Sequence, residues 1–265
     1  MIDNADVPTG MGVQAGMADD LAFSIASRCF WHIGQDEWAD IAASDVWAQF
    51  VAALARMGAR SQAPYMHRLA TPPTWEEFHI AQRRFVGGLP SSAVPVESLY
   101  ATPDQMIVRD PSGKRAYWLQ QPALYMRQLI ERLGMEVPHE FQDCPDHLAL
   151  ELDMASTLLA LGANDQAADF IADRLGWLAR YRARLVEIAD TARPTERPGA
   201  LQRAEVDPGS PGVRPGGCSG ASRADSGVAD APSAPVDLLF HAALVDALID
   251  VASGWKVRHG HAACG

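Results

Sequence analysis

Residues 144–162 read CPDHLALELDMASTLLALG and form the clearest helical pattern of the chain. Pro145 suits a first helical turn, and Gly162 follows directly after the last apolar residue, as is common where helices end. Four apolar residues recur along one face at helical spacing: Leu148, Leu152, Ala155 and Leu159. The segment therefore predicts a helix that carries Asp146 and His147 in its first turn.

A second informative stretch lies about fifty residues earlier, where residues 94–100 read VPVESLY. It belongs to a proline-containing region, 89–109, that shows neither helical nor strand periodicity and predicts a long ordered loop. Such loops inside a domain usually carry function, which makes Pro95, Ser98 and Tyr100 candidates. The alternative for Tyr100 is a structural anchor, held by ring burial and one hydroxyl hydrogen bond.

Helical spacing of apolar residues continues on both sides of these stretches. It predicts an all-α fold, a single globular bundle of roughly nine to eleven helices over residues 19–192, after a flexible N-terminus at 1–18. One helix is expected to start with Thr74 as its N-cap and to run to about Val86. Another is expected to run without a break over 167–189.

The character of the chain changes late in the sequence. Residues 193–235 hold seven prolines and seven glycines with almost no bulky apolar side chains, which predicts a disordered linker. Residues 236–254 are again helical in pattern, and we expect this helix to pack back on the bundle because an isolated helix of that length is marginal in water. Residues 255–265 are expected to form a flexible tail.

Composition narrows the possible partners. With 48% apolar and 21% charged residues the chain is of the globular class, and its net charge of −11 argues against nucleic acid and suits a basic peptide. No segment resembles an export signal or a membrane span, and a reducing cytoplasm fits the absence of any C-x-x-C pair. The four cysteines are Cys29, Cys144, Cys218 and Cys264.

No motif of catalysis or cofactor binding is evident. Ser98 lacks a G-x-S-x-G context and no phosphate-binding loop occurs, so we expect no enzyme, no catalytic residue and no cofactor. His147 and Glu151 have an i, i+4 spacing but lack a third metal ligand, so no metal is assigned to them. A metal-handling role remains an alternative through three residues of the tail: His259, His261 and Cys264.

Four short motifs, in this order, carry a resemblance to a known family. They are RFVGG at 84–88, ESLY at 97–100, Asp146-His147 followed by Glu151-Leu152, and FIADRLGW at 170–177. Together they resemble the TorD/DmsD family of cytoplasmic chaperones for molybdoenzymes that are exported through the twin-arginine route. The resemblance extends over about 22–192 and the last helix.

The resemblance implies a function. It points to a chaperone that binds the twin-arginine leader and the apo-form of a molybdopterin-containing oxidoreductase, aids cofactor insertion and delays export, as a monomer or an exchanged homodimer. The implied peptide-binding residues are Asp146, His147, Glu151, Pro95, Ser98, Tyr100 and Phe85. Two positions depart from the family pattern, because Val96 stands where tryptophan is usual and Arg174 where histidine is. A helical scaffold of the same fold that has lost leader binding is therefore an alternative.

Overall fold

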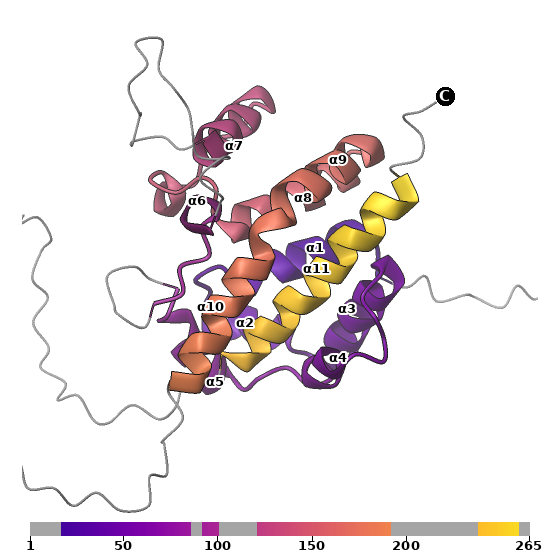
Figure 1. Cartoon of the computed structure of the whole chain (residues 1–265), viewed down its shortest axis with the longest axis vertical. Coiled ribbons are helices and arrows are strands. Elements are labelled where there is room, and N and C mark those ends of the chain that lie inside the picture. The colour runs from indigo at the N-terminus through magenta and orange to yellow at the C-terminus, as the bar shows by residue number, and fades with distance from the viewer. Residues whose placement is uncertain (1–16, 86–91, 101–120, 192–237, 260–265) are drawn as a thin grey trace, which may run out of the picture.

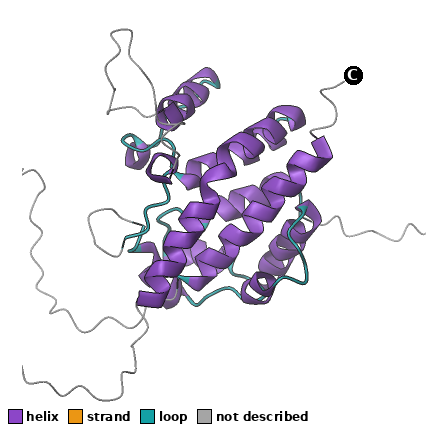
Figure 2. Cartoon of the chain, viewed as in Figure 1, coloured by secondary structure: helices purple, strands orange, loops and turns teal. Residues whose placement is uncertain are grey.

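The computed structural model describes residues 17–85, 92–100, 121–191 and 238–259, and these contain helices but no strand (Figure 1). The predicted all-α class is confirmed, as Figure 2 shows. The α-helices are α1 (Asp19–Arg28), α2 (Gln35–Ile41), α3 (Ser44–Met57), α4 (Pro64–Leu69), α5 (Trp75–Gln82), α6 (Glu97–Tyr100), α7 (Gln121–Arg132), α8 (Leu148–Ala160), α9 (Asn164–Arg174), α10 (Leu178–Thr191) and α11 (Leu239–His259). Two 3-10 turns are η1 (His139–Phe141) and η2 (Leu175–Trp177).

Helices α1 and α8 pack closely against each other at the centre of the bundle. Ala26 and Ala149 are fully buried, and small side chains allow two helix backbones to approach. Two serine hydroxyls then bond across the contact: Ser27 donates to the carbonyl oxygen of Ala149, and Ser156 donates to that of Asp20, each at 2.8 Å. These bonds satisfy polar groups in the interior and fix α8, whose first turn adjoins the candidate site.

Helix α11 lies along α10 and also contacts α4 and α9 (Figure 1). Its carboxylates anchor it on two sides. Asp250 accepts hydrogen bonds from the Tyr65 hydroxyl and from Arg60 Nε, the latter at 2.6 Å. Asp246 pairs with Arg182 on α10, with Nε and Oδ1 3.1 Å apart. These polar contacts therefore hold α11 against the rest of the bundle.

The predicted start of α5 is confirmed, but its predicted end is wrong. Thr74 and Glu77 form a capping box, in which the Thr74 hydroxyl accepts from the Glu77 N–H and the Glu77 carboxylate accepts from the Thr74 N–H at 2.8 Å. The helix ends at Gln82 rather than at Val86. It stops because the N–H of Phe85 turns back to the Gln82 carbonyl oxygen at 3.0 Å, which closes a tighter turn.

The expected single helix over 167–189 is also wrong, because η2 interrupts it. Gly176 stands at the centre of this interruption, where a glycine weakens α-helical winding. The change of winding directs both Leu175 and Trp177 into the interior, where they are 3% and 5% exposed. The break therefore brings Leu175 and Trp177 into the core, and the Trp177 ring also belongs to the candidate functional site described below.

Several expectations fall outside the described residues. These are most of the flexible N-terminus, the linker at 193–235 and the last six residues of the tail. The final helix, expected over 236–254, extends from Leu239 to His259. Within the described ranges, no helix has the length and apolar character needed to cross a membrane.

Candidate functional site

Two segments that are far apart in the sequence lie side by side at the start of α8. The backbone N–H of Leu148 donates to the carbonyl oxygen of Pro95 at 2.8 Å. One residue further along, Val96 and His147 form an isolated antiparallel β-bridge. The expected loop over 89–109 is therefore interrupted, because the chain enters the short helix α6 directly after this bridge. Residues 101–109 of that prediction lie outside the described residues.

Asp146 holds the loop through both its backbone and its side chain. Its carbonyl oxygen accepts the N–H of Glu97 at 3.0 Å, and its Oδ2 accepts the N–H of Ser98 at 2.8 Å. The residue is only 1% exposed, and burial raises the pKa of its carboxyl group although the bonds from Ser98 oppose that rise. Its expected place in the first turn of α8 is wrong, because α8 begins at Leu148 and Asp146 caps α6 instead.

His147 is the N-cap of α8. Its Nδ1 accepts the backbone N–H of Ala149 at 3.2 Å, so the neutral ring carries its proton on Nε2. Burial lowers the pKa of this imidazole to about 3, which keeps it uncharged at neutral pH. The ring lies against Phe141 with centroids 4.7 Å apart. His147 is therefore a rigid and neutral hydrogen-bond donor beside an aromatic wall.

Glu151 takes part in a buried acidic group rather than orienting the ring of His147. Its Oε2 accepts from the indole Nε1 of Trp177 at 3.1 Å. Burial raises the pKa of Glu151 well above its usual value, and the neighbouring carboxyl of Glu97 raises it further. Glu97 is itself paired with Arg174, with Oε2 and Nη1 3.3 Å apart. The buried carboxyl groups of Glu97, Asp146 and Glu151 thus form one acidic group, in which Arg174 is paired with Glu97.

Tyr100 packs as an anchor at the end of α6. Its ring stacks on Trp177, with centroids 5.6 Å apart and an interplanar angle of 15°, and meets Tyr181 edge-on at 5.3 Å. Arg180 Nη1 donates to the Tyr100 carbonyl oxygen at 2.6 Å. These contacts agree with the structural alternative for Tyr100.

Phe85 and His147 border the same apolar cavity. The cavity has a volume of about 460 Å³ and lies between the end of α1, the turn after α5 and the segment before α8. Its lining residues are Phe30, Trp31, His32, Gln82, Phe85, Val94, Glu140, Phe141, Cys144 and His147. Burial raises the pKa of the Cys144 thiol to about 11, so the cysteine presents a neutral surface there.

The implied peptide-binding residues thus lie on the two sides of the Val96–His147 bridge. On one side are the acidic group and the aromatic anchor, which contain Ser98, Tyr100, Asp146 and Glu151. On the other side is the apolar cavity, with Phe85 and His147. Pro95 contributes its carbonyl oxygen, which accepts the N–H of Leu148 at the bridge itself.

Sequence analysis assigned no binding role to four residues that shape these surfaces, namely Glu97, Phe141, Arg174 and Trp177. Glu97 and Trp177 lie within the quoted motifs, so their positions could have been found. The pairing of Arg174 with Glu97 could not, because the residues are 77 positions apart. Phe141 lies in η1, outside every motif.

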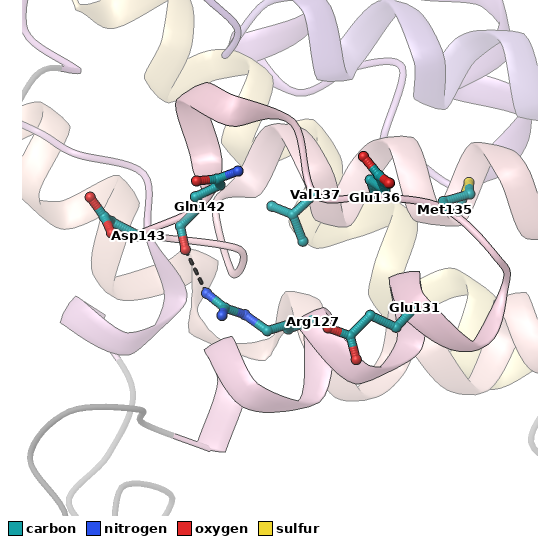
Figure 3. Close-up of a pocket in the computed structure, with 7 residues that line it drawn as sticks. All are labelled: Arg127, Glu131, Met135, Glu136, Val137, Gln142 and Asp143. Atoms are coloured by element: carbon teal, nitrogen blue, oxygen red, sulfur yellow. Dashed lines mark hydrogen bonds between the residues drawn. The ribbon is translucent and has the colours of Figure 1, made fainter.

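A second hollow of about 410 Å³ lies between α7 and the segment that leads to α8 (Figure 3). It is polar. Arg127 Nη2 donates to the Gln142 carbonyl oxygen at 2.6 Å, while three carboxylates stand around it, those of Glu131, Glu136 and Asp143. Neither this hollow nor any other place among the described residues gathers three His, Cys, Asp or Glu side chains fit to hold a metal ion.

Comparison with known proteins places these residues in context. Residues 48–189 match the family described as "Nitrate reductase delta subunit". A curated relative, "Chaperone protein TorD" from Shewanella piezotolerans (strain WP3 / JCM 13877), is 30% identical over 110 residues, which are 41% of this chain and 49% of that protein. The chain therefore spans about half the length of that relative. No solved structure gives a significant match.

Proposed function

Because the chain belongs to the nitrate reductase delta subunit family, a TorD-like family, we propose that it is a chaperone for the maturation of a molybdoenzyme. Its client would be the apo-form of a molybdopterin-containing oxidoreductase in the cytoplasm. The chaperone would bind the client's twin-arginine leader, delay export and aid insertion of the cofactor. The expectation that the chain is not an enzyme agrees with this membership.

The apolar cavity beside His147 is the observation that supports leader binding. A volume of about 460 Å³ falls within the range of roughly 300–1,000 Å³ that is usual for ligand pockets. Phe30, Phe85 and Phe141 offer three aromatic walls for the apolar segment of a leader, which follows its paired arginines. The Nε2–H of His147 supplies one polar contact, suited to a peptide carbonyl oxygen.

The cavity also explains why binding would need no large rearrangement of the bundle. Its walls come from the residues after α1, from the end of α5 and the turn after it, and from the segment before α8, and two serine hydroxyls join α1 to α8 beside them. Rigid walls lose little conformational entropy when a ligand enters, so more of the contact energy remains as affinity. The proposed mode is therefore an apolar helix laid against a preformed surface.

Isothermal titration tests this function. The probe is a synthetic leader peptide of a molybdoenzyme, with its paired arginines and apolar segment. We expect micromolar or tighter binding, and roughly tenfold weaker binding in Phe85→Ala and in His147→Ala, which corresponds to about 1.4 kcal/mol. Leu161→Ala is the matched control, because Leu161 is 68% exposed at the far end of α8.

Two results would count against the proposal. Absence of heat with a correctly folded chain would favour the helical scaffold of the same fold. If Leu161→Ala weakened binding as much as the cavity variants do, the leader would have to bind outside the cavity. Helicity measured by circular dichroism must stay unchanged in each variant for the comparison to hold.

A further inference from the structure

A guanidinium of the chain itself occupies the acidic side of the site. Arg174, on α9, places Nη1 3.3 Å from Oε2 of Glu97 and lies over the ring of Tyr125 at 4.9 Å from its centroid. The Arg174 side chain is 23% exposed, whereas that of Glu97 is only 5% exposed. Arg174 therefore covers the acidic group from the solvent side.

The acidic group contains more carboxyl groups than its one cation pairs with. Asp146 and Glu151 are buried with Glu97, yet Arg174 is the only ion-pair partner that the described residues give to these three carboxyl groups. Glu151 is fully buried and shares a side-chain hydrogen bond with the carboxyl group of Glu97, and its Oε1 accepts from no N–H or hydroxyl group in the described part of the chain. A buried acceptor without a donor is costly, so this oxygen marks a place where a further donor would be stabilising.

The existing pair is also weak by its geometry. Charge-assisted hydrogen bonds between guanidinium and carboxylate are usually about 2.7–2.9 Å long and often bidentate. Among the described residues, Arg174 makes one contact to Glu97, at 3.3 Å, and no hydrogen bond to Glu151. A guanidinium that bonded to both Glu97 and Glu151 would therefore be bound more favourably than Arg174 is, even after the Arg174–Glu97 contact is lost.

We propose that this acidic group is a binding site for an arginine side chain, which Arg174 occupies in the free chain and which an arginine of the bound leader takes over. The leader part of this inference rests on the function proposed above. The geometry suits it, because Val94 lines the apolar cavity while Glu97, three residues later, is the acidic acceptor. A peptide with an arginine followed by an apolar segment would meet both surfaces across the Val96–His147 bridge.

Chemical rescue tests the site without any leader. In the full chain, Arg174→Ala removes the internal guanidinium, and we expect a lower melting temperature. Ethylguanidinium at about 10 mM, too dilute to act as a denaturant, should raise that temperature by at least about 2 °C, whereas ethylammonium should not. Wild type should not respond, since its site is filled. An equal rise of the melting temperature in wild type and in Arg174→Ala, or no rise in Arg174→Ala, would refute a guanidinium site.

Leader titration tests the exchange. Removing the internal competitor should tighten binding of the leader to Arg174→Ala by about three- to tenfold, because the competent fraction of the chain rises. A leader in which lysine replaces both arginines should bind Arg174→Ala no more tightly than it binds wild type. If Arg174→Ala folds poorly, Arg174→Lys is the second variant. The matched control is Arg127→Ala, in the second hollow. Unchanged or weaker binding to Arg174→Ala would overturn the exchange.

The two experiments separate the two claims. Rescue by ethylguanidinium together with no leader binding by wild type or any variant would refute the proposed function and still support a site for guanidinium. Leader binding by wild type without rescue, and without the gain in Arg174→Ala, would refute this inference and leave the proposed function standing.

Discussion

Ser98 and Asp146 are 48 residues apart in the chain, and the backbone N–H of Ser98 donates to Oδ2 of Asp146 at 2.8 Å. This bond, with the backbone pairing beside it, ties the loop that ends in α6 to the start of α8. The acidic group and the apolar cavity meet at this junction. Its stability therefore sets the shape of both surfaces.

Asp146→Ala should loosen this junction. The change leaves the Ser98 amide without its acceptor, so we expect the free energy of unfolding to fall by about 1–3 kcal/mol in urea titrations. Leader binding should weaken as well, because Glu97 and Val94 lose their fixed positions. Asp143→Ala is the control, since Asp143 is exposed three residues earlier and should change neither quantity. Full stability in Asp146→Ala would show that the bond is dispensable.

Glu151→Gln should stabilise the chain at alkaline pH. Because burial and Glu97 raise the pKa of Glu151 well above 4.5, the folded chain keeps a proton that the unfolded chain releases once the pH exceeds 4.5. Stability is thus lost as the pH rises, by up to about 1.4 kcal/mol per pH unit for this group. Urea unfolding near pH 8 and near pH 5 should show a smaller difference in Glu151→Gln than in wild type. An identical pH dependence would contradict the raised pKa.

His241→Gln should make the stability of the chain less sensitive to acidification below pH 6.5. His241 lies buried on α11, with Nε2 3.2 Å from the Cys29 carbonyl oxygen, and burial lowers its pKa to about 3 from 6.5. Below pH 6.5 the unfolded chain binds a proton that the folded chain does not, so stability falls as the pH falls, by up to about 1.4 kcal/mol per unit. His147 adds a similar loss.

Glutamine can still donate to the Cys29 carbonyl oxygen but cannot titrate. Thermal melts at several values between pH 6.5 and 4.5 should therefore show a shallower decline in His241→Gln than in wild type. His139→Gln is the control, because it makes the same substitution at an exposed histidine. A parallel decline in His241→Gln and wild type would rule out His241 as a source of acid sensitivity.

Trp177→Phe should be destabilising through one lost hydrogen bond. The ring can still stack on Tyr100, but Glu151 loses the donor of its Oε2, which should lower the free energy of unfolding by about 1–3 kcal/mol. The same change in a Glu151→Leu background should cost less, because leucine offers no acceptor for the indole N–H. A double-mutant cycle by urea unfolding measures this coupling, and additive effects would contradict it.

Local features of this chain could be predicted, because neighbouring residues produce them. The N-cap of α5 at Thr74 could be predicted from the four residues 74–77, which form the capping box. Gly162 follows the expected helix end with a φ of 72°, a left-handed conformation that favours glycine. The order of the short motifs then led to the family that the comparisons show.

The contacts across the site could not be predicted in the same way. The Ser98–Asp146 bond and the Arg174–Glu97 pair join residues 48 and 77 positions apart, and no periodicity indicates such pairs. The break at Gly176 misled the helix prediction, because the apolar spacing continues through it. That break directs Trp177 towards Glu151, so the acidic group depends on a feature that periodicity does not reveal.

Photo-crosslinking tests the central claim, that the apolar segment of a leader enters the cavity beside His147. A leader peptide that carries benzophenone in place of one apolar residue would be irradiated with the full chain, and the adduct located by mass spectrometry. The account predicts adducts on Phe30, Phe85 or Phe141, abolished by excess unlabelled leader. Adducts at Arg127 or Met135 in the second hollow, or none that the unlabelled leader suppresses, would contradict it.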